Sequence, residues 1–230
     1  MIDWHSHILP GMDDGSKNVA ESIAMLNKQA SQGIKTVVAT PHFYANDETV
    51  DSFLKRRAVS HDSLRKEIPE FPINLLLGAE VRYYQGISRM QDLKKLKIEG
   101  SKVLLLEMPF CQWTEYMIRD LIELTRIGGL QIVLAHIERY QSLQKKSDWL
   151  RIAESGILMQ VNASYFRSLF TRRKAISLLE NGGIHFLGSD CHNMAERPPL
   201  LGDACDIIKK KLGEEFLFQM NAFGHSMFVQ

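Results

Sequence analysis

The sequence predicts an α/β protein in which parallel strands close, or nearly close, into a barrel. Seven short apolar runs that favour β-structure recur along its 230 residues, and a helical pattern follows each run. Alternation of near-continuous apolar strands with amphipathic helices is typical of a parallel sheet covered by helices. Seven such units favour a barrel related to the eightfold one, with a doubly wound open sheet as the alternative fold.

The expected elements follow one another without a shift in composition. Strands are expected at residues 1–4, 34–40, 73–79, 103–106, 131–135, 157–161 and 184–188. Helical patterns between them include residues 19–32, 50–68, 115–127 and 175–180. Glycines that can end helices stand at Gly33, Gly128, Gly156 and Gly182. No linker rich in Pro, Gly or Ser marks a boundary, so we expect residues 1–230 to form a single domain.

Composition argues against several classes of function. The formal net charge of +1 gives no bulk basic field, so a nucleic-acid partner is not expected. No apolar stretch approaches the roughly 20 residues that a membrane span needs, and a signal peptide before the first strand is not expected. The three cysteines, Cys111, Cys191 and Cys205, are widely spaced and odd in number. This pattern favours reduced thiols and a cytoplasmic protein.

Residues that can bind metals follow six of the seven expected strands. His5 and His7 come first, and their imidazoles project together because residues i and i+2 of a strand share a face. The other ends carry His42, Glu80, Glu107, His136, Asp190 and His192. Parallel α/β barrels bring the carboxyl ends of their strands to one mouth. Mixed imidazole and carboxylate ligands there favour Mn, Fe or Zn over Ca or Mg.

Four other positions are expected to hold no metal. The sixth strand ends at Asn162, which offers no obvious ligand. His61 falls in the middle of a helical pattern, His185 inside a strand and His225 in the C-terminal tail. We expect these three histidines to be ordinary surface or core residues.

The motifs at the strand ends resemble those of a known family. "HSHILPGMDDG", "TPH", "GAE", "LLLE", "AHIER" and "GSDCHN…RP" occur in order between residue 1 and about residue 200. They resemble the polymerase and histidinol phosphatase (PHP) superfamily, and within it the bacterial manganese-dependent protein-tyrosine phosphatases of capsule and exopolysaccharide operons. The resemblance implies the PHP fold, a distorted seven-stranded (β/α)7 TIM-like barrel.

The resemblance also implies a set of site residues. A site for three Mn²⁺ ions would be formed by His5, His7, Asp14, His42, Glu80, Glu107, His136, Asp190 and His192, with Glu80 bridging two ions. Fe, Zn, Co or Mg are the alternative metals, and Asp13 is the less favoured ligand of its pair. Arg139 and Arg197 match the family's phosphate-binding arginines. His42 or His192 could relay a proton if metal did not occupy it fully.

The function implied is hydrolysis of phosphotyrosine on a cytoplasmic bacterial tyrosine kinase, which would regulate capsular or exopolysaccharide synthesis. A hydroxide that bridges the metals would attack phosphorus in line. A charge count agrees with this, because Asp14, Glu80, Glu107 and Asp190 bring four negative charges. Three divalent ions would leave a net positive cluster suited to a phosphate dianion.

Several alternatives stay open. "CHNMAER", from Cys191 to Arg197, has the C-x5-R spacing of cysteine-dependent phosphatases, but it lacks glycine and follows Asp190. The substrate could instead be histidinol phosphate or another small phosphomonoester, or the protein could bind phosphopeptides with little turnover. Either arginine could be an ordinary surface residue. Oligomeric state is undetermined. The aromatic residues near strand ends could wall a phosphotyrosine ring or pack in the core: Trp4, Tyr44, Trp113 and Tyr165.

Overall fold

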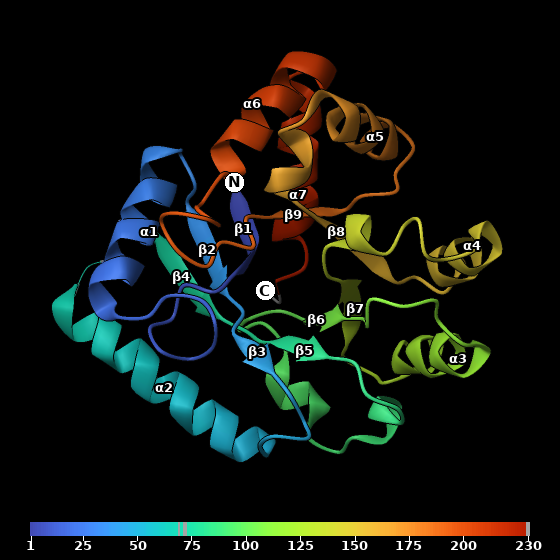
Figure 1. Ribbon diagram of the computed structural model, residues 1–230, viewed down its shortest axis with the longest axis horizontal. Coiled ribbons are helices and arrows are strands. Elements are labelled where there is room, and N and C mark those ends of the chain that lie inside the picture. Colours follow the sequence, from blue (N-terminus) through green and yellow to red (C-terminus); the bar gives the residue numbers. More distant parts are fainter. Residues whose placement is uncertain (69, 71–72, 229–230) are drawn as a thin grey trace.

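The chain folds as an α/β protein with short parallel strands at the centre and helices around them (Figure 1). The computed structural model describes residues 1–68, 70 and 73–228. The strands of these residues are β1 (Ile2–Ser6), β2 (Thr36–Ala39), β3 (His42–Phe43), β4 (Asn74–Leu77), β5 (Glu80–Arg82), β6 (Val103–Glu107), β7 (Gln131–Leu134), β8 (Leu158–Asn162) and β9 (Phe186–Gly188). The α-helices are α1 (Val19–Ser31), α2 (Val50–Glu67), α3 (Glu115–Leu124), α4 (Lys146–Glu154), α5 (Leu169–Glu180), α6 (Leu201–Leu212) and α7 (Glu214–His225).

The strands form two parallel sheets, in the orders β1-β2-β4 and β3-β5-β6-β7-β8-β9. The parallel α/β alternation is therefore confirmed, but two expected strand ranges are wrong. The strands expected at 34–40 and 73–79 are shorter, and each is followed by a second strand, β3 or β5. Pro41, which has no amide N–H, stands at the first break, and Gly78 stands at the second. His42 and Glu80 thus lie inside short strands rather than after long ones.

The first strand and the last lie side by side, so the strands curl back on themselves. The Asp190 amide donates to the His5 carbonyl at 2.8 Å, and the His7 amide donates to the Cys191 carbonyl at 2.9 Å. The buried carboxylate of Asp3 accepts from the Ser189 amide at 2.7 Å. Residues from the two ends of the chain are thereby joined at the carboxyl ends of β1 and β9.

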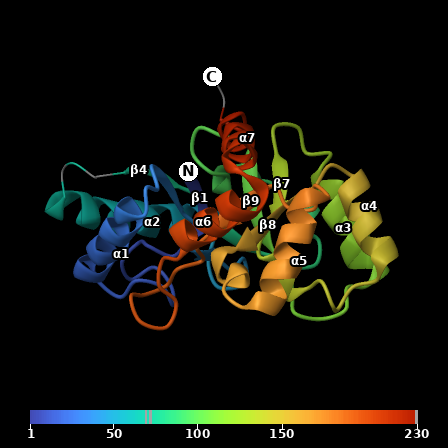
Figure 2. The same ribbon diagram turned by 90° about the horizontal axis from the view of Figure 1, so that it is seen from above.

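A small apolar core lies between the strands and α7. Its buried members are Ile2, Trp4, Val38, Ile98, Val103, Leu105, Val133, Ala135 and Phe186. Trp4 packs on Phe186 at 4.6 Å between ring centroids and lies against Gly224 of α7. In Figure 2, α7 projects from one side of the strands, and the loops after β1 and β9 lie on the other. Trp4 is therefore a core residue that fills the end remote from those loops.

Side-chain caps fix the starts of four helices. Asn18, Thr49, Thr114 and Ser168 each accept from the amide three residues later. The cap at Ser168 explains why α5 begins well before the expected residue 175. At helix ends, the glycines with positive φ include Gly33, Gly156 and Gly182. The stop expected at Gly128 is wrong, because α3 already ends at Leu124 with Thr125 as its C-cap.

The remaining expectations concern isolated residues. Cys111, Cys191 and Cys205 are free thiols. His61 lies in α2 as expected, but His185 directly precedes β9 and His225 ends α7, so the strand and tail placements are wrong. The Nδ1 atom of His185 accepts from the Met159 amide at 3.1 Å. Within the described residues, no helix combines the length and apolarity needed to cross a membrane.

Candidate metal centre

All nine residues expected to ligate metal gather at the carboxyl ends of the strands. Strand alternation explains how several of them arrive there. Leu105 packs in the inner core, and Glu107, two residues later, lies on the same face of β6. Phe186 of β9 packs in the same core, and the alternate positions after it along the chain are Gly188 and Asp190. The apolar inner face of a strand thus continues directly into the polar cluster.

Glu80 is the centre of this cluster and is almost fully buried. Its Oε2 lies 3.1 Å from His5 Nε2, 3.2 Å from His7 Nε2 and 3.1 Å from His42 Nδ1. Its Oε1 lies 2.9 Å from His136 Nε2. Burial alone would raise the pKa of Glu80, but the surrounding imidazoles, His5 foremost, hold it well below its usual range. Glu80 is therefore an anion in contact with four imidazoles.

Hydrogen bonds outside the cluster set which imidazole nitrogens face into it. His5 Nδ1 lies 3.2 Å from Gln160 Oε1, and His7 Nδ1 lies 2.7 Å from Asp13 Oδ2. An amide oxygen and a carboxylate oxygen only accept, so each Nδ1 carries the proton and each Nε2 presents a lone pair. Asp13, not expected to be a ligand, thus orients a ligand instead.

The arrangement of these lone pairs fits a divalent cation. The Nε2 atoms of His5 and His7 lie 3.1 Å apart, and both face Glu80 Oε2 and Asp190 Oδ1. Electron-rich atoms packed so closely repel one another unless positive charge lies among them. Burial lowers the pKa of His5, but Glu80 and Asp190 outweigh it and raise that pKa. The site therefore attracts positive charge, and its N and O donors suit Mn, Fe or Zn.

Two further imidazoles leave buried nitrogens without a hydrogen-bond partner in the described chain. They are His42 Nδ1, whose 3.1 Å approach to Glu80 is outside hydrogen-bond geometry, and His192 Nε2. His192 Nδ1 donates to the Asp190 carbonyl at 3.0 Å, so its Nε2 bears a lone pair. The exposed carboxylate of Asp14 lies 3.6 Å from His42 Nε2 and 3.4 Å from His192 Nε2. A buried imidazole nitrogen that has no hydrogen-bond partner and lies near a carboxylate is suited to bind a metal ion.

The ligand atoms fall into three overlapping groups whose members lie within 4.8 Å of one another. The groups are His5, His7 and Asp190; His42, Glu80 and Glu107; and His7, Asp14, His42 and His192. His136 lies beside the second group, with its Nε2 3.6 Å from Glu107 Oε1. The division into three resembles the expected three-ion scheme, although the expected membership differs in detail.

Three arginines border the cluster. Arg139 and Arg197 both donate to Asp190 Oδ2, at 2.5 and 2.8 Å. Arg82 donates to Glu107 Oε2 at 2.8 Å. Each arginine is about one-third exposed, which leaves N–H groups that can reach a bound anion. Sequence reasoning missed Arg82, although its position two residues after Glu80 on the same strand was a usable signal.

Two ligand positions have unusual backbone geometry. His136 has φ of 33° and Asp190 has φ of 50°, in the left-handed region that non-glycine residues seldom adopt. Each such residue costs about 1–3 kcal/mol, and such residues concentrate where function holds them. Each stands two residues after the end of a strand, β7 or β9, so the turn aims the side chain into the cluster instead of along the sheet.

The cysteine loop does not form a phosphate cradle. Cys191 is fully buried, and burial together with nearby Asp3 raises the pKa of its thiol. Asn193 Oδ1 accepts from the amides of Ala195, Glu196 and Arg197. Those amides would have to bind phosphate in a cysteine-dependent phosphatase. The C-x5-R spacing therefore has no thiolate chemistry behind it.

Two exposed aromatic rings stand over the imidazoles. Tyr44 stacks on His42 at 5.3 Å between centroids, and Phe110 stacks on His136 at 6.2 Å. Phe110 is 50% exposed, and Arg139 lies over its ring at 5.8 Å. Of the other aromatic candidates, Trp113 is buried like Trp4, and Tyr165 is partly buried. Phe110 was missed because it belongs to a loop, three residues beyond β6.

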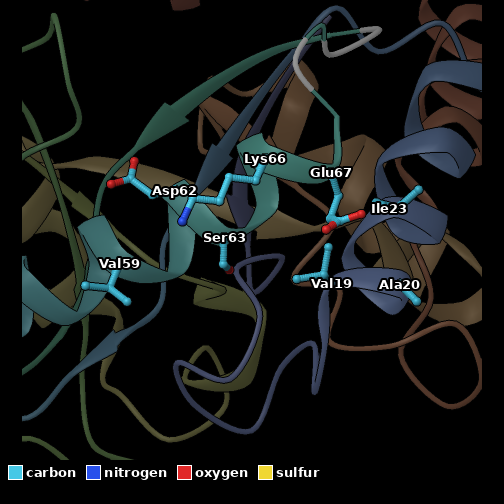
Figure 3. A pocket seen from close by; sticks show the side chains of 8 residues that line it. All are labelled: Val19, Ala20, Ile23, Val59, Asp62, Ser63, Lys66 and Glu67. Atoms are coloured by element: carbon cyan, nitrogen blue, oxygen red, sulfur yellow. The ribbon is translucent and has the colours of Figure 1, made fainter.

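A separate groove of about 660 Å³ lies between α1 and α2 (Figure 3). Val19 and Ile23 of α1 and Asp62, Lys66 and Glu67 of α2 are among the residues that line it. It contains no imidazole and shares no residue with the metal cluster, so we assign no chemistry to it.

Comparisons with known proteins agree with this geometry. Residues 1–223 match the family described as capsular polysaccharide synthesis, CpsB/CapC. Tyrosine-protein phosphatase YwqE of Bacillus subtilis (strain 168) is 32% identical over 227 residues, covering 96% of this chain and 88% of that protein. Tyrosine-protein phosphatase CpsB of Streptococcus pneumoniae is 32% identical over 232 residues, covering 93% and 91%.

A solved structure from work on YwqE of Bacillus subtilis and CpsB of Streptococcus pneumoniae, described as unique metal-dependent tyrosine phosphatases, superposes with a TM-score of 0.83. It is 29% identical in sequence, and the match covers 99% of this chain and 94% of that chain. The resemblance carried by the strand-end motifs is thereby confirmed at the level of the family. The chain belongs to the CpsB/CapC family of capsular polysaccharide synthesis.

Proposed function

We propose that this chain is a metal-dependent protein-tyrosine phosphatase. The observation that carries the proposal is a buried cluster of imidazoles and carboxylates bordered by three arginines, in a chain whose relatives are named tyrosine-protein phosphatases. The expected substrate is a phosphotyrosine segment of a bacterial tyrosine kinase in the cytoplasm, where its dephosphorylation would regulate capsule or exopolysaccharide synthesis.

Three Mn²⁺ ions would be shared among the ligands as follows. One would bind His5, His7, Glu80 and Asp190; a second would bind Glu80, Glu107 and His136; the third would bind Asp14, His42 and His192. Divalent ions so placed would activate water near neutral pH and stabilise charge on the phosphoryl oxygens. Glu80 supports this sharing because its two oxygens contact different imidazoles, Oε2 that of His5 and Oε1 that of His136.

The chain's own residues would orient the phosphoryl group and the ring. Arg139 and Arg197 are held by Asp190, so their remaining N–H groups are positioned before substrate arrives. Tyr44 and Phe110 offer apolar surface to a tyrosyl ring at the edge of the site. The leaving phenolate, with a pKa of about 10, needs less protonation than an alkoxide.

His42 and His192 are proposed as ligands rather than as a proton relay. His192 donates from Nδ1 to a carbonyl and presents Nε2 to the cluster, so neither nitrogen is free to shuttle a proton. Burial lowers the pKa of His192 to about 4, which keeps the ring neutral as a ligand must be. Departure of the phenolate would then proceed without a dedicated acid from this pair.

The strand pairing also supports a proposal about architecture. Taking β2 with β3 and β4 with β5 as interrupted single strands gives seven units, and the hydrogen bonds between β1 and the segment after β9 join the ends. We propose a distorted seven-stranded barrel that forms one phosphatase domain over residues 1–230.

The test is hydrolysis of a phosphotyrosyl peptide and of histidinol phosphate by protein stripped of metal, with and without added Mn²⁺. Peptide turnover that needs Mn²⁺ and exceeds histidinol phosphate turnover is expected. Preference for histidinol phosphate would instead indicate a small-molecule phosphatase. Tight phosphopeptide binding without turnover in Mn²⁺ would indicate a regulator and contradict the proposal.

A further inference from the structure

Strand β8 contributes no expected ligand, yet its side chains lie directly beneath the cluster. Leu158, Gln160 and Asn162 alternate onto one face of the strand. Leu158 packs against the inner apolar core, and the two amide side chains that follow are almost completely buried. Buried amides need hydrogen-bond partners, and theirs are residues of the metal centre.

The hydrogen bonds of these two amides run in one direction. The His136 amide donates to Gln160 Oε1 at 2.8 Å, which identifies that atom as the oxygen. Gln160 Nε2 then donates to Asn162 Oδ1 at 3.0 Å, and Asn162 Nδ2 donates to Asp190 Oδ2 at 2.7 Å. Because an amide accepts only at oxygen and donates only at nitrogen, one backbone N–H sets the orientation of both side chains.

This direction determines which atoms of two ligands face the metal. Gln160 Oε1 can only accept, so the 3.2 Å contact with His5 requires a proton on Nδ1 and leaves Nε2 as the ligand atom. Asn162 engages Oδ2 of Asp190, so Oδ1 remains turned toward the Nε2 atom of His5 at 3.6 Å. If both side-chain amides were flipped, Gln160 would present N–H groups to His5, and Asn162 would present an oxygen to the Asp190 carboxylate.

The hydrogen bonds that run from the His136 amide through Gln160 and Asn162 to Asp190 form a relay. One glycine, Gly188, leaves the space that this relay needs. A Cβ atom at Gly188 would lie 2.5 Å from the Cβ of His5 and 2.7 Å from Gln160 Nε2. The close approach of β9 to β1 and β8 therefore depends on the missing side chain. Sequence, strand register and hydrogen bonding agree on one geometry for these residues.

We propose that Gln160 and Asn162 are positioning residues that set the affinity of the ion held by His5, His7 and Asp190. The inference rests on the proposed metal centre. It assigns to β8, which has no expected ligand, the role of orienting His5 of β1 and Asp190, which follows β9. Partners that orient metal ligands typically change metal affinity by about 10–100-fold when they are removed. Ions held by the remaining ligands would bind nearly as before.

The experiment is a Mn²⁺ titration, by calorimetry and by metal analysis after dialysis, of wild type, Gln160→Leu, Asn162→Leu and Gln160→Glu. We expect one ion to bind about 10–100-fold more weakly in the two leucine variants. Gln160→Glu keeps an acceptor for both the His136 amide and His5 but loses the N–H that donates to Asn162, so it should recover only part of the affinity. Gln144→Leu is the matched control, because Gln144 is a buried glutamine whose hydrogen bonds within the described residues go to the backbones of Cys111 and Trp113.

Melting temperatures with chelator and with Mn²⁺ separate positioning from folding. The leucine variants should lose part of the Mn²⁺-induced stabilisation that the control retains. Wild-type Mn²⁺ affinity in Gln160→Leu and Asn162→Leu would overturn the relay while leaving the centre intact. Wild-type affinity in Gln160→Glu would also overturn it, since the donation from Gln160 to Asn162 would then be irrelevant. Absence of Mn²⁺ binding by the wild type would overturn the metal centre itself.

Discussion

Arg139 and Arg197 have two proposed roles, which are to bind phosphate and to hold Asp190 in place. Replacing them singly and together separates these roles. Arg139→Ala removes one guanidinium proposed to bind phosphate, but Arg197 and Asn162 still donate to Asp190 Oδ2. A hydrogen bond to a charged group is worth about 1.5–3 kcal/mol, and 1.4 kcal/mol is a factor of ten. We therefore expect kcat/KM for a phosphotyrosyl peptide to fall by about 10–150-fold, with metal content near wild type. Arg197→Ala should behave alike.

The double variant should behave differently from either single one. With both guanidinium groups gone, Asp190 keeps one of these three donors and loses the two charged ones, so metal content should fall as well. Arg151→Ala is the control, because Arg151 is similarly exposed but pairs with Glu115 on the helical surface. Wild-type kcat/KM in both single variants, or loss of metal in either one, would refute the reasoning.

Other perturbations test the centre and the fold. Glu80→Ala should release more than one ion per chain by metal analysis, and full occupancy would exclude a bridging role. Cys191→Ser should keep most of the activity on an aryl phosphate while a chelator abolishes it; the reverse pattern would restore the thiol mechanism. Gly188→Ala should lower both melting temperature and Mn²⁺ loading, because the added methyl meets His5; unchanged values would contradict the close approach. Burial lowers the pKa of His185 below 6.5, so the unfolded chain binds more protons and stability should fall as pH drops from about 7 to about 5. In urea unfolding, His185→Gln should flatten that dependence; an unchanged slope would assign the acid sensitivity elsewhere.

Strand-end reasoning selected candidate ligands that the structure brings together, because the end of an apolar run marks the end of a strand. Glu107 is the last residue of β6, and His136 lies two residues after the end of β7, where the periodic pattern stops. Parallel topology then brings such residues to one place without knowledge of any particular contact. The gathering of these candidate ligands could therefore be predicted from a local signal combined with a general rule of packing.

The partners of the ligands could not be predicted in the same way. The contact between Gln160 and His5 joins residues 155 apart and depends on how the curled strands come into register. Hydrophobic alternation tells which face a residue occupies but not which distant residue it meets there. Arg82 and Phe110 were missed for related reasons, since one lies within a strand and the other on a loop. The breaks at Pro41 and Gly78 likewise interrupt runs that read as continuous.

The joining of β1 to the segment after β9 makes the centre a late product of protein synthesis. His5 leaves the ribosome long before Asp190 and His192, which belong to the same cluster but follow it only after nearly the whole set of strands. A nascent chain that stops short of them holds two histidines with few of their partners. At the proposed centre, metal would therefore be held at full affinity only after Asp190 and His192 have been synthesised and the contacts between β1 and the segment after β9 have formed.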